Sequence, residues 1–295
     1  MKLRLFLLAI LCAATAIPAR AQVSVGLEIK RRLFLRYEPI IATVRIQNLS
    51  GRDLVLHDQE QPWFGFDVAS VNADIIVPPR NPNYKLDALE LKIGETVKRN
   101  VDLTQLYGMS EFGMHRIKAT VFVQQLNKMF VSKPELIDLN EGKTIWQQTV
   151  GVPETLPNAG RSHTVKLIEF QDDKRYLYVR VEDPDEGRVF CTRKLGHMID
   201  GTTPQMQFDS TNNLYILHLV APKTYLLTNI GVNGEFLGQH TCDAPKTKPY
   251  LRRIADGSVQ LVGAHRQPTV ATNGSPGPVA PPVKLSDRPP GLPKE

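Results

Sequence analysis

The chain has few cysteines and few aromatic residues, and its hydrophobic and charged fractions are both ordinary. Three cysteines in 295 residues exclude a small disulfide-stapled scaffold. The charged fraction of 22% excludes a polytopic membrane protein, and the hydrophobic fraction of 42% excludes a disordered polymer. The composition also excludes collagen-like and coiled-coil chains. The length predicts about two domains, each with its own core.

The first 21 residues have the order of a secretory signal peptide. Lys2 and Arg4 precede an apolar run over residues 5–17, and Ala19-Arg20-Ala21 places small residues at the end. We expect cleavage before Gln22 and therefore a secreted or periplasmic protein of bacterial type. The apolar run is short for a bilayer span, and a retained anchor is the alternative.

The excess of basic residues lies near the two ends of the chain. The formal net charge is +6, and the leader carries three cations and no acid, so cleavage lowers the charge to +3. The last thirty residues account for +2 of that remainder. The body is therefore nearly neutral, and it has no basic stripe with interleaved aromatic residues. We expect no nucleic-acid partner.

The body alternates apolar and polar residues with a period of two, which predicts an all-β fold. The alternating segments lie near residues 23–29, 40–46, 64–68, 97–103 and 117–123. Such alternation is typical of a sheet with one buried and one solvated face. Short helical turns are expected only at residues 84–90 and 103–110.

The N-terminal half resembles the immunoglobulin-like antiparallel β-sandwich domains of secreted proteins. The carrying residues are Tyr37-Glu38-Pro39-Ile40, leading to Asn48, and LKIGETVKRNVDLTQLYGMSEFGMHRIKATVFV at residues 91–123. This class includes BsuPI-type proteinase-inhibitor domains and macroglobulin-like modules, and the resemblance covers residues 22–152. It implies a fold and leaves the ligand open. The usual corner tyrosine is His115 here, which leaves the polar tether of that corner to an imidazole or to no group.

A second domain is expected at residues 162–265, after a linker at 153–161. Tyr176 aligns with Tyr225, which sets two similar stretches beside each other at an offset of 49 residues. Each unit predicts four short strands, with residues 258–264 as a strand left over. The spacing resembles propeller blades, but two units cannot close a ring. We expect a β-meander packed on the first domain; assembly of copies and a coincidence of hairpins are the alternatives.

Residues 266–295 contain eight prolines, three glycines and no aromatic residue. Such a segment buries too little apolar surface to offset the entropy of ordering it, so the sequence predicts a disordered tail. A partner-docking role for this tail is the alternative to a plain unstructured one.

After a two-residue difference in the next turn, the same alignment sets Cys191 on Cys242, and this pair is the disulfide candidate. An exported protein with two mature cysteines often joins them. Equivalent positions in neighbouring units need not come within bridging distance, so two buried thiols remain the alternative.

No constellation of metal-ligating or catalytic residues stands out. The seven histidines include no pair spaced for one ion, and His57-Asp58 with Glu60 is the best local metal candidate, weighed against a solvated strand end. The acidic residues at 182–186 predict a hairpin turn, because Pro184 interrupts the alternate ligands that calcium needs. We therefore expect no cofactor, no metal and no catalytic residue.

Two tryptophans are the candidate binding or domain-junction residues. Trp63 is followed by Phe64 and Phe66, and alternation sets its ring on the opposite side from theirs. Trp146 lies near the end of the first predicted domain.

These observations favour an exported, non-enzymatic binding or envelope-associated module whose ligand is an unknown protein or envelope partner. The module is expected to be a monomer or a small oligomer. The alternatives are a proteinase-inhibitor-like sandwich, which rests on fold resemblance alone, and a hydrolase or metal enzyme whose residues converge only in three dimensions.

Overall fold

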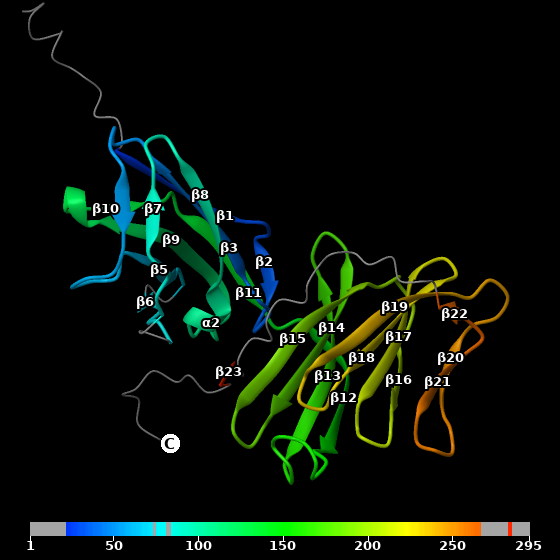
Figure 1. The fold of residues 1–295 in the computed structure, drawn as a ribbon. Helices are drawn as coiled ribbons and strands as arrows, with labels where there is room; N and C mark the ends of the chain where they lie inside the picture. The colour runs from blue at the N-terminus through cyan, green and yellow to red at the C-terminus, as the bar shows by residue number, and fades with distance from the viewer. Residues whose placement is uncertain (1–21, 73–74, 81–83, 267–282, 285–295) are drawn as a thin grey trace, which may run out of the picture.

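The computed structural model describes residues 22–72, 75–80, 84–266 and 283–284 (Figure 1). The predicted signal peptide and most of the predicted disordered tail lie outside the described residues.

The all-β prediction is confirmed for the described residues. Their regular structure is strands apart from α2 (Leu103–Leu106) and one 3-10 turn (Gln124–Leu126). The helix lies inside the turn expected at 103–110, and Asp102 caps it by accepting from the Thr104 N–H. Residues 84–90 form no helix.

Two sheets form the N-terminal domain (Figure 1). The first has the order β1 (Val23–Ile29), β3 (Ile41–Asn48), β8 (Thr96–Asp102). The second has the order β2 (Leu33–Leu35), β11 (Glu135–Asn140), β9 (Gly113–Val123), β5 (Phe64–Ser70), β6 (Ile75–Ile76), and β10 (Lys128–Val131) also pairs with β9. A small ribbon joins β4 (Leu54–Leu56) to β7 (Leu89–Leu91). Among the described strands, only β2 and β11 run parallel to each other.

The alternation in sequence accounts for the core of this domain. In β3, Ala42, Val44 and Ile46 are fully buried, whereas Ile41 is exposed. Their side chains share one cluster with Val121 of the facing sheet. Burying each branched aliphatic side chain contributes about 1.5–3 kcal/mol, so the two-sheet arrangement is held mainly by this face.

The C-terminal domain contains two four-stranded antiparallel meanders and a hairpin. The first meander is β12 (Lys143–Gly151), β13 (Ser162–Gln171), β14 (Arg175–Asp183), β15 (Arg188–His197), and β23 (Val283–Lys284) adds to its β15 edge. The second is β16 (Gln205–Phe208), β17 (Leu214–Ala221), β18 (Thr224–Ile230), β19 (Phe236–Asp243), with β22 (His265–Arg266) on β19. The hairpin joins β20 (Tyr250–Arg253) to β21 (Val259–Val262).

The two meanders pack against each other around one core. Leu167 and Val179 of the first sheet and Ile216 and Ile230 of the second belong to the same buried cluster. A two-layer sandwich buries both apolar faces without a closed ring. Tyr176 and Tyr225 are the second residues of β14 and β18, the corresponding strands of the two sheets.

The boundary between the domains lies earlier than the sequence predicted. Strand β12 pairs with β13 along its length, so the N-terminal domain ends near Asn140 and not at Val152. Residues 153–161 connect β12 to β13 within one sheet. The prediction was wrong because the backbone groups of β12 find their ladder partner only in the following hairpin strand.

The domains meet along the segment that contains β2. Leu35 packs with Ile168 and Tyr178 of the C-terminal domain in one small cluster. Tyr37 packs on Val189 of β15. The C-terminal domain therefore presents β13, β14 and β15 to its neighbour.

Candidate functional site

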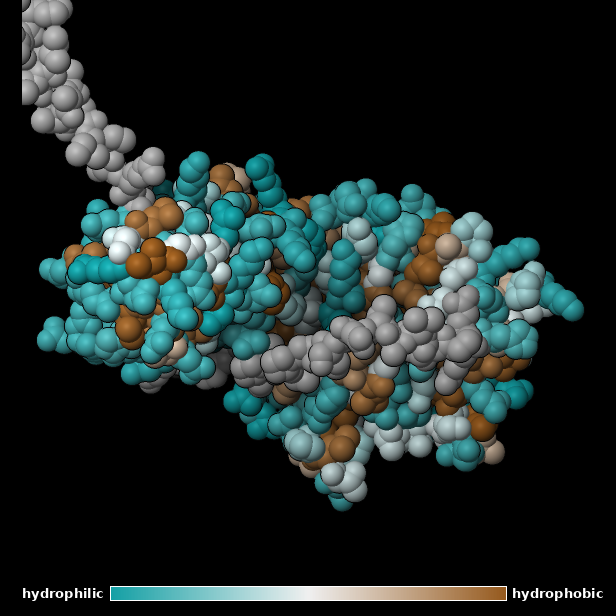
Figure 2. Space-filling model, turned by 45° about the horizontal axis from the view of Figure 1, so that its top comes forward, coloured by the Kyte–Doolittle hydropathy of each residue, from teal (hydrophilic) through white to brown (hydrophobic). Residues whose placement is uncertain are grey.

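The N-terminal domain carries most of the large apolar side chains that remain exposed. Of fourteen such residues in the described part of the chain, twelve lie in this domain. Figure 2 shows apolar residues as separate patches on a largely hydrophilic surface. Scattered exposed apolar residues are ordinary on folded proteins, so a binding site needs a second feature. A hollow lined by aromatic rings, beside an unpaired strand edge, occurs at β5.

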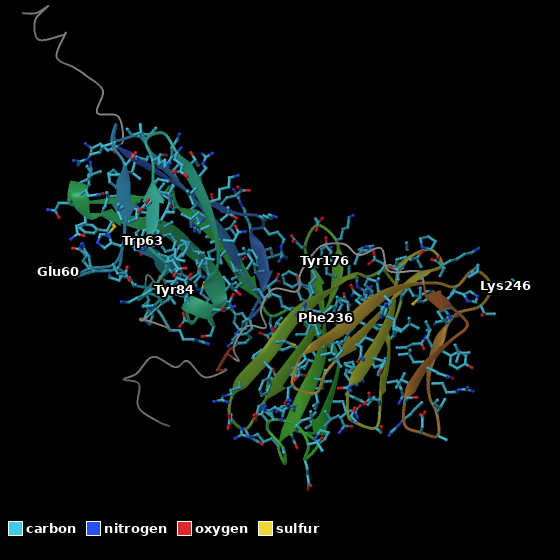
Figure 3. The ribbon with its side chains drawn as sticks, in the orientation of Figure 1. Glu60, Trp63, Tyr84, Tyr176, Phe236 and Lys246 are labelled. Carbon is cyan, nitrogen blue, oxygen red and sulfur yellow. The ribbon has the colours of Figure 1, made fainter. Side chains whose placement is uncertain are left out.

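Strand β5 begins immediately after Trp63, and the preceding loop fixes that residue. The Trp63 N–H donates to Asp58 Oδ1 at 3.0 Å, and its indole Nε1–H donates to the Leu86 carbonyl at 3.3 Å. Trp63 is 2% exposed. It therefore belongs to the core of the N-terminal domain, and its ring lies at the entry of β5 (Figure 3).

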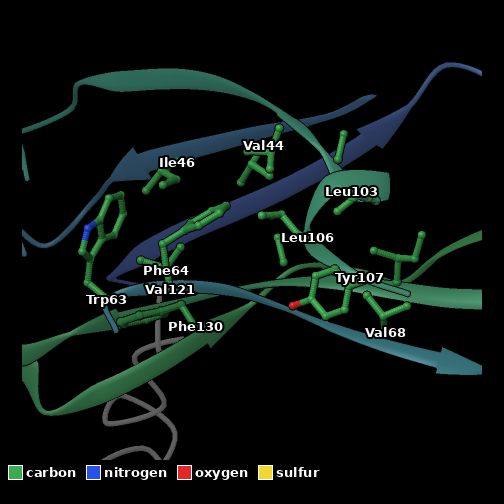
Figure 4. Close-up of a cluster of buried hydrophobic side chains, with 14 of the residues drawn as sticks. Val44, Ile46, Trp63, Phe64, Val68, Leu103, Leu106, Tyr107, Val121 and Phe130 are labelled. Atoms are coloured by element: carbon green, nitrogen blue, oxygen red, sulfur yellow. The ribbon is translucent and has the colours of Figure 1, made fainter. Parts of the chain in front are cut away.

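Four aromatic rings form a continuous row along β5. The ring centroids are 5.5 Å apart for Trp63 and Phe64, 5.2 Å for Phe64 and Phe66, and 6.4 Å for Phe66 and Tyr107. The last two pairs meet edge to face, the arrangement that the ring quadrupoles favour. Figure 4 shows Trp63, Phe64 and Tyr107 within this cluster. The contacts between neighbouring rings therefore fix the position of each ring in the row.

The register of the sheet leaves one edge of β5 largely open. Phe64 lies opposite Val121 of β9, and the Phe122 N–H donates to the Trp63 carbonyl at 2.8 Å. Backbone groups in an antiparallel pair alternate between the two sides of a strand. The odd-numbered residues of β5 therefore bond to β9, and Phe64, Phe66 and Val68 direct their N–H and C=O groups to the other side.

Only some of the backbone groups of β5 that point away from β9 have hydrogen-bond partners among the described residues. Strand β6 covers its far end, where the Val77 N–H donates to the Val68 carbonyl at 2.9 Å. The Tyr107 hydroxyl donates to the Phe66 carbonyl at 2.7 Å. Among the described residues, none bonds to the N–H or C=O of Phe64 or to the N–H of Phe66. Two backbone N–H donors and one carbonyl acceptor at this edge thus have no partner among the described residues.

A hollow of about 290 Å³ lies at the same place. The described residues that line it come from the loop before β5, from β5 itself, from residues near β6 and α2, and from β9 and β10: Gln61, Pro62, Trp63, Phe64, Gly65, Phe66, Pro79, Tyr84, Leu106, Tyr107, Thr120 and Met129. None of them carries a charge. Its lining is suited to apolar side chains and to prolyl rings.

Two tyrosine hydroxyls give this hollow polar groups that stay protonated. Burial raises the pKa of Tyr107, and burial together with the charge of Asp87 raises the pKa of Tyr84. Both phenols are therefore neutral at physiological pH. Neutral hydroxyls donate and accept hydrogen bonds without the desolvation penalty of a buried charge.

The metal candidate at His57 forms part of the loop beside this hollow. The His57 ring pairs with the Gln59 side chain at 2.6 Å. Asp58 holds the Trp63 N–H and lies 3.7 Å from Lys85 Nζ. His57 Nε2 and the Asp58 carboxylate thus contact groups of the loop and its neighbours. Within the described residues, no group of three His, Cys, Asp or Glu side chains lies close enough to hold a metal ion.

His115 supplies a polar contact at the corner where a tyrosine was expected. Its Nδ1 lies 3.0 Å from the Gly113 carbonyl, and the residue is 1% exposed. Burial lowers the pKa of this imidazole. A neutral ring that donates to the carbonyl suits such a position.

The acidic residues at 182–186 form the β14–β15 turn that the sequence predicted. Asp183 Oδ1 accepts from the N–H groups of Asp185 and Glu186 at 3.0 and 3.1 Å. Arg161 pairs with both Asp183 and Glu186. The carboxylates of Asp183 and Glu186 are thus bonded within the turn or to Arg161.

The two mature cysteines are separate thiols in the structure. Cys191 lies on β15 and Cys242 on β19, and neither is bridged. The structure thus holds two thiols, and the pairing of Cys191 with Cys242 stays a prediction. Burial raises the pKa of Cys191 to about 11, which keeps it protonated and unreactive.

Trp146 is partly buried and packs against the core of the C-terminal sandwich. Its ring centroid is 6.1 Å from that of Phe208 on the facing sheet. Neither tryptophan is among the residues that join the domains, a role taken by Leu35, Tyr37 and their partners.

Sequence reasoning selected Trp63 but missed the other side of the hollow. Tyr84, Tyr107 and Met129 are far apart in the chain, and no local pattern connects them. Their only signal is aromatic or apolar character in segments without a strong strand period. Tertiary pairing of β5 with β9 and the packing of α2 bring them together.

The comparisons add no relative to this description. No family model, no curated protein and no solved structure matches the chain. In the described part of the chain, no helix is long and apolar enough to cross a membrane.

Proposed function

We propose that this chain is an exported, non-enzymatic binding module that takes an extended peptide segment along the open edge of β5. The observation that carries the proposal is the edge of β5 at Phe64 and Phe66, beside a row of aromatic rings: no described residue bonds to the N–H or C=O of Phe64 or to the N–H of Phe66. An added strand or a polyproline II segment satisfies such an edge through its own backbone.

The chemistry of the lining favours a peptide with apolar or prolyl side chains. The hollow of about 290 Å³ is uncharged, and its aromatic rings and Pro62 and Pro79 offer flat apolar surfaces. Its volume is at the small end of the roughly 300–1,000 Å³ typical of small-molecule sites. The hollow has space for one or two side chains, and the edge of β5 offers backbone hydrogen bonds. These features suit a peptide segment that lies across the edge better than they suit a buried cofactor.

Export is the second part of the proposal and rests on the leader at residues 1–21. Its charged start, apolar run and small residues support removal before Gln22. The described fold begins with β1 at Val23, so cleavage there removes none of the strands.

Calorimetric titration tests the binding site. Short extended peptides rich in proline and leucine, and scrambled polar peptides as the comparison, are titrated into the chain from Gln22 onward. The Met129→Glu variant places a charge in the lining of the hollow. We expect the dissociation constant of the apolar peptides to rise at least ~10-fold, because desolvating a carboxylate opposes apolar contact.

Met114→Glu is the matched control. Met114 and Met129 are exposed to similar extents, 42% and 46%, on strands of the same sheet, but Met114 does not line the hollow. We expect its dissociation constant to stay within about twofold of the parent. Equal effects of the two substitutions, or no binding of any extended peptide, would overturn the proposal.

A further inference from the structure

We infer that the C-terminal residues 285–295 of the same chain occupy the β5 hollow and compete with other peptides for it. This inference rests on the proposed function and names one occupant of that site. The segment reads LSDRPPGLPKE, with three prolines and two leucines in eleven residues. Proline-rich segments of this kind adopt an extended conformation at low entropic cost and dock in aromatic-lined grooves.

The last described strand fixes where this segment starts. Strand β23 pairs antiparallel with β15, with Lys284 opposite Arg188 and Val283 opposite Val189. Val189 packs on Tyr37 of the N-terminal domain. The chain therefore leaves β23 beside the junction of the two domains and not at a remote end of the molecule (Figure 1).

A short series of contacts connects that junction to the hollow. Glu38, next to Tyr37, accepts from Thr104 Oγ1 through its carbonyl at 2.9 Å. Thr104 belongs to α2, and the last residue of α2, Leu106, lines the hollow together with Tyr107. Eleven residues at about 3.1 Å each span roughly 34 Å in a polyproline II conformation. The segment is therefore long enough to follow this series of contacts from the end of β23 to the hollow.

The backbone of a proline-rich segment also complements the open edge. Prolines lack an N–H but retain a carbonyl acceptor. The N–H groups of Phe64 and Phe66 are the donors that the edge leaves free among the described residues. Prolyl rings of the segment and the uncharged lining supply the apolar contacts.

The test compares three chains that all begin at Gln22: one ending at Glu295, one ending at Lys284, and the full chain with Pro289→Gly and Pro290→Gly. The shortened chain ends with β23 and therefore contains every described strand. The probe is the synthetic peptide LSDRPPGLPKE, and calorimetry gives its dissociation constant for each chain.

We expect the peptide to bind the shortened chain and the double-glycine chain at least ~10-fold more tightly than the full chain, because the tethered segment competes at a high effective concentration. Met129→Glu in the shortened chain is expected to remove this binding. Equal binding by full and shortened chains overturns the inference. So does a failure of the shortened chain to bind this peptide while it binds another extended peptide, and that result leaves the proposed function standing.

Two further outcomes would show that the hollow binds no peptide or that it binds the segment of a second copy. A shortened chain that binds no extended peptide overturns the proposed function and the inference together. A full chain whose mass in light scattering rises with concentration, while the shortened chain stays monomeric, assigns the segment to the hollow of a second copy and overturns the intramolecular arrangement.

Discussion

The guanidinium of Arg180 lies over the ring of Tyr37, 5.1 Å from its centroid, and this contact joins the two domains. Arg180 is 1% exposed. Its three nitrogens donate to Thr192 Oγ1, to Glu141 Oε1 and to the Arg36 carbonyl at 3.1, 2.6 and 2.6 Å. A buried arginine with every nitrogen bonded is stable, because its charge is compensated and its donors are satisfied.

Substitution Arg180→Ala is expected to lower the free energy of unfolding by about 2–3 kcal/mol. The substitution leaves the buried Thr192 hydroxyl and the Arg36 carbonyl without this donor and removes the contact with Tyr37. Denaturation by urea measures the change. Arg188→Ala is the control, because Arg188 pairs with Glu186 at a partly exposed position and such pairs contribute about 0–1 kcal/mol. Equal losses in both variants would contradict the junction role of Arg180.

The turn between β17 and β18 holds a lysine in a strained conformation. Lys223 has a φ of 65° and is exposed. An L-residue in the left-handed region costs about 1–2 kcal/mol, and glycine avoids most of it. We therefore expect Lys223→Gly to raise the free energy of unfolding by about 0.5–1 kcal/mol, measured by thermal denaturation.

Lys174 is the matched position in the other meander, 49 residues earlier. It is exposed in the β13–β14 turn but does not have a positive φ. Lys174→Gly is therefore expected to lower stability by up to about 1 kcal/mol, because glycine only adds freedom to the unfolded chain. A gain at 174, or a loss at 223, would contradict the backbone assignment.

His218 makes the stability of the C-terminal domain dependent on pH. It is 1% exposed on β17. Burial lowers its pKa from 6.5 to about 4; an interaction with the His197 backbone opposes this shift, and the charge of His197 adds to it. Between these values the unfolded chain binds a proton that the folded chain does not.

The free energy of unfolding is therefore expected to fall by up to about 3 kcal/mol as the pH drops from about 6.5 to about 4, with no further contribution from this residue outside that window. Urea denaturation at several pH values measures it. His218→Leu removes the titrating group, so most of the decline should disappear in that variant. An unchanged decline would assign the effect to other groups, such as His115.

Alkylation tests the state of the cysteines. The protein is denatured without reductant and treated with an alkylating reagent. We expect Cys191 and Cys242 each to gain one alkyl group in the mass spectrum, because both are thiols in the fold. Before denaturation both should react slowly, since Cys242 is buried and the pKa of Cys191 is about 11. Recovery of an unmodified, linked pair would contradict the structure.

The alternation along the chain predicted the fold class because sheet pairing follows a local pattern. In β3 the residues expected to be buried are buried, and the helical turn expected after Asp102 is α2. The boundary at 152 was wrong because the pattern marks β12 as a strand without marking its partner. Which strand a sequence pairs with is a tertiary property.

The site was less predictable than the fold for the same reason. Trp63 stood out because of its size and its neighbours Phe64 and Phe66. The open edge that makes them useful exists because β6 is two residues long and covers only the end of β5. No composition or spacing rule in the sequence reports which backbone groups of a strand stay unpaired.

The most direct measurement of the proposed site is residue-resolved amide exchange by NMR, with and without a saturating extended peptide. We expect exchange at Phe64 and Phe66 to slow by at least ~10-fold on binding, because the peptide accepts hydrogen bonds from both N–H groups. Gly65 is the internal control, since its N–H already faces β9 and should change little. Unchanged exchange at Phe64 and Phe66 in the saturated complex would contradict the account.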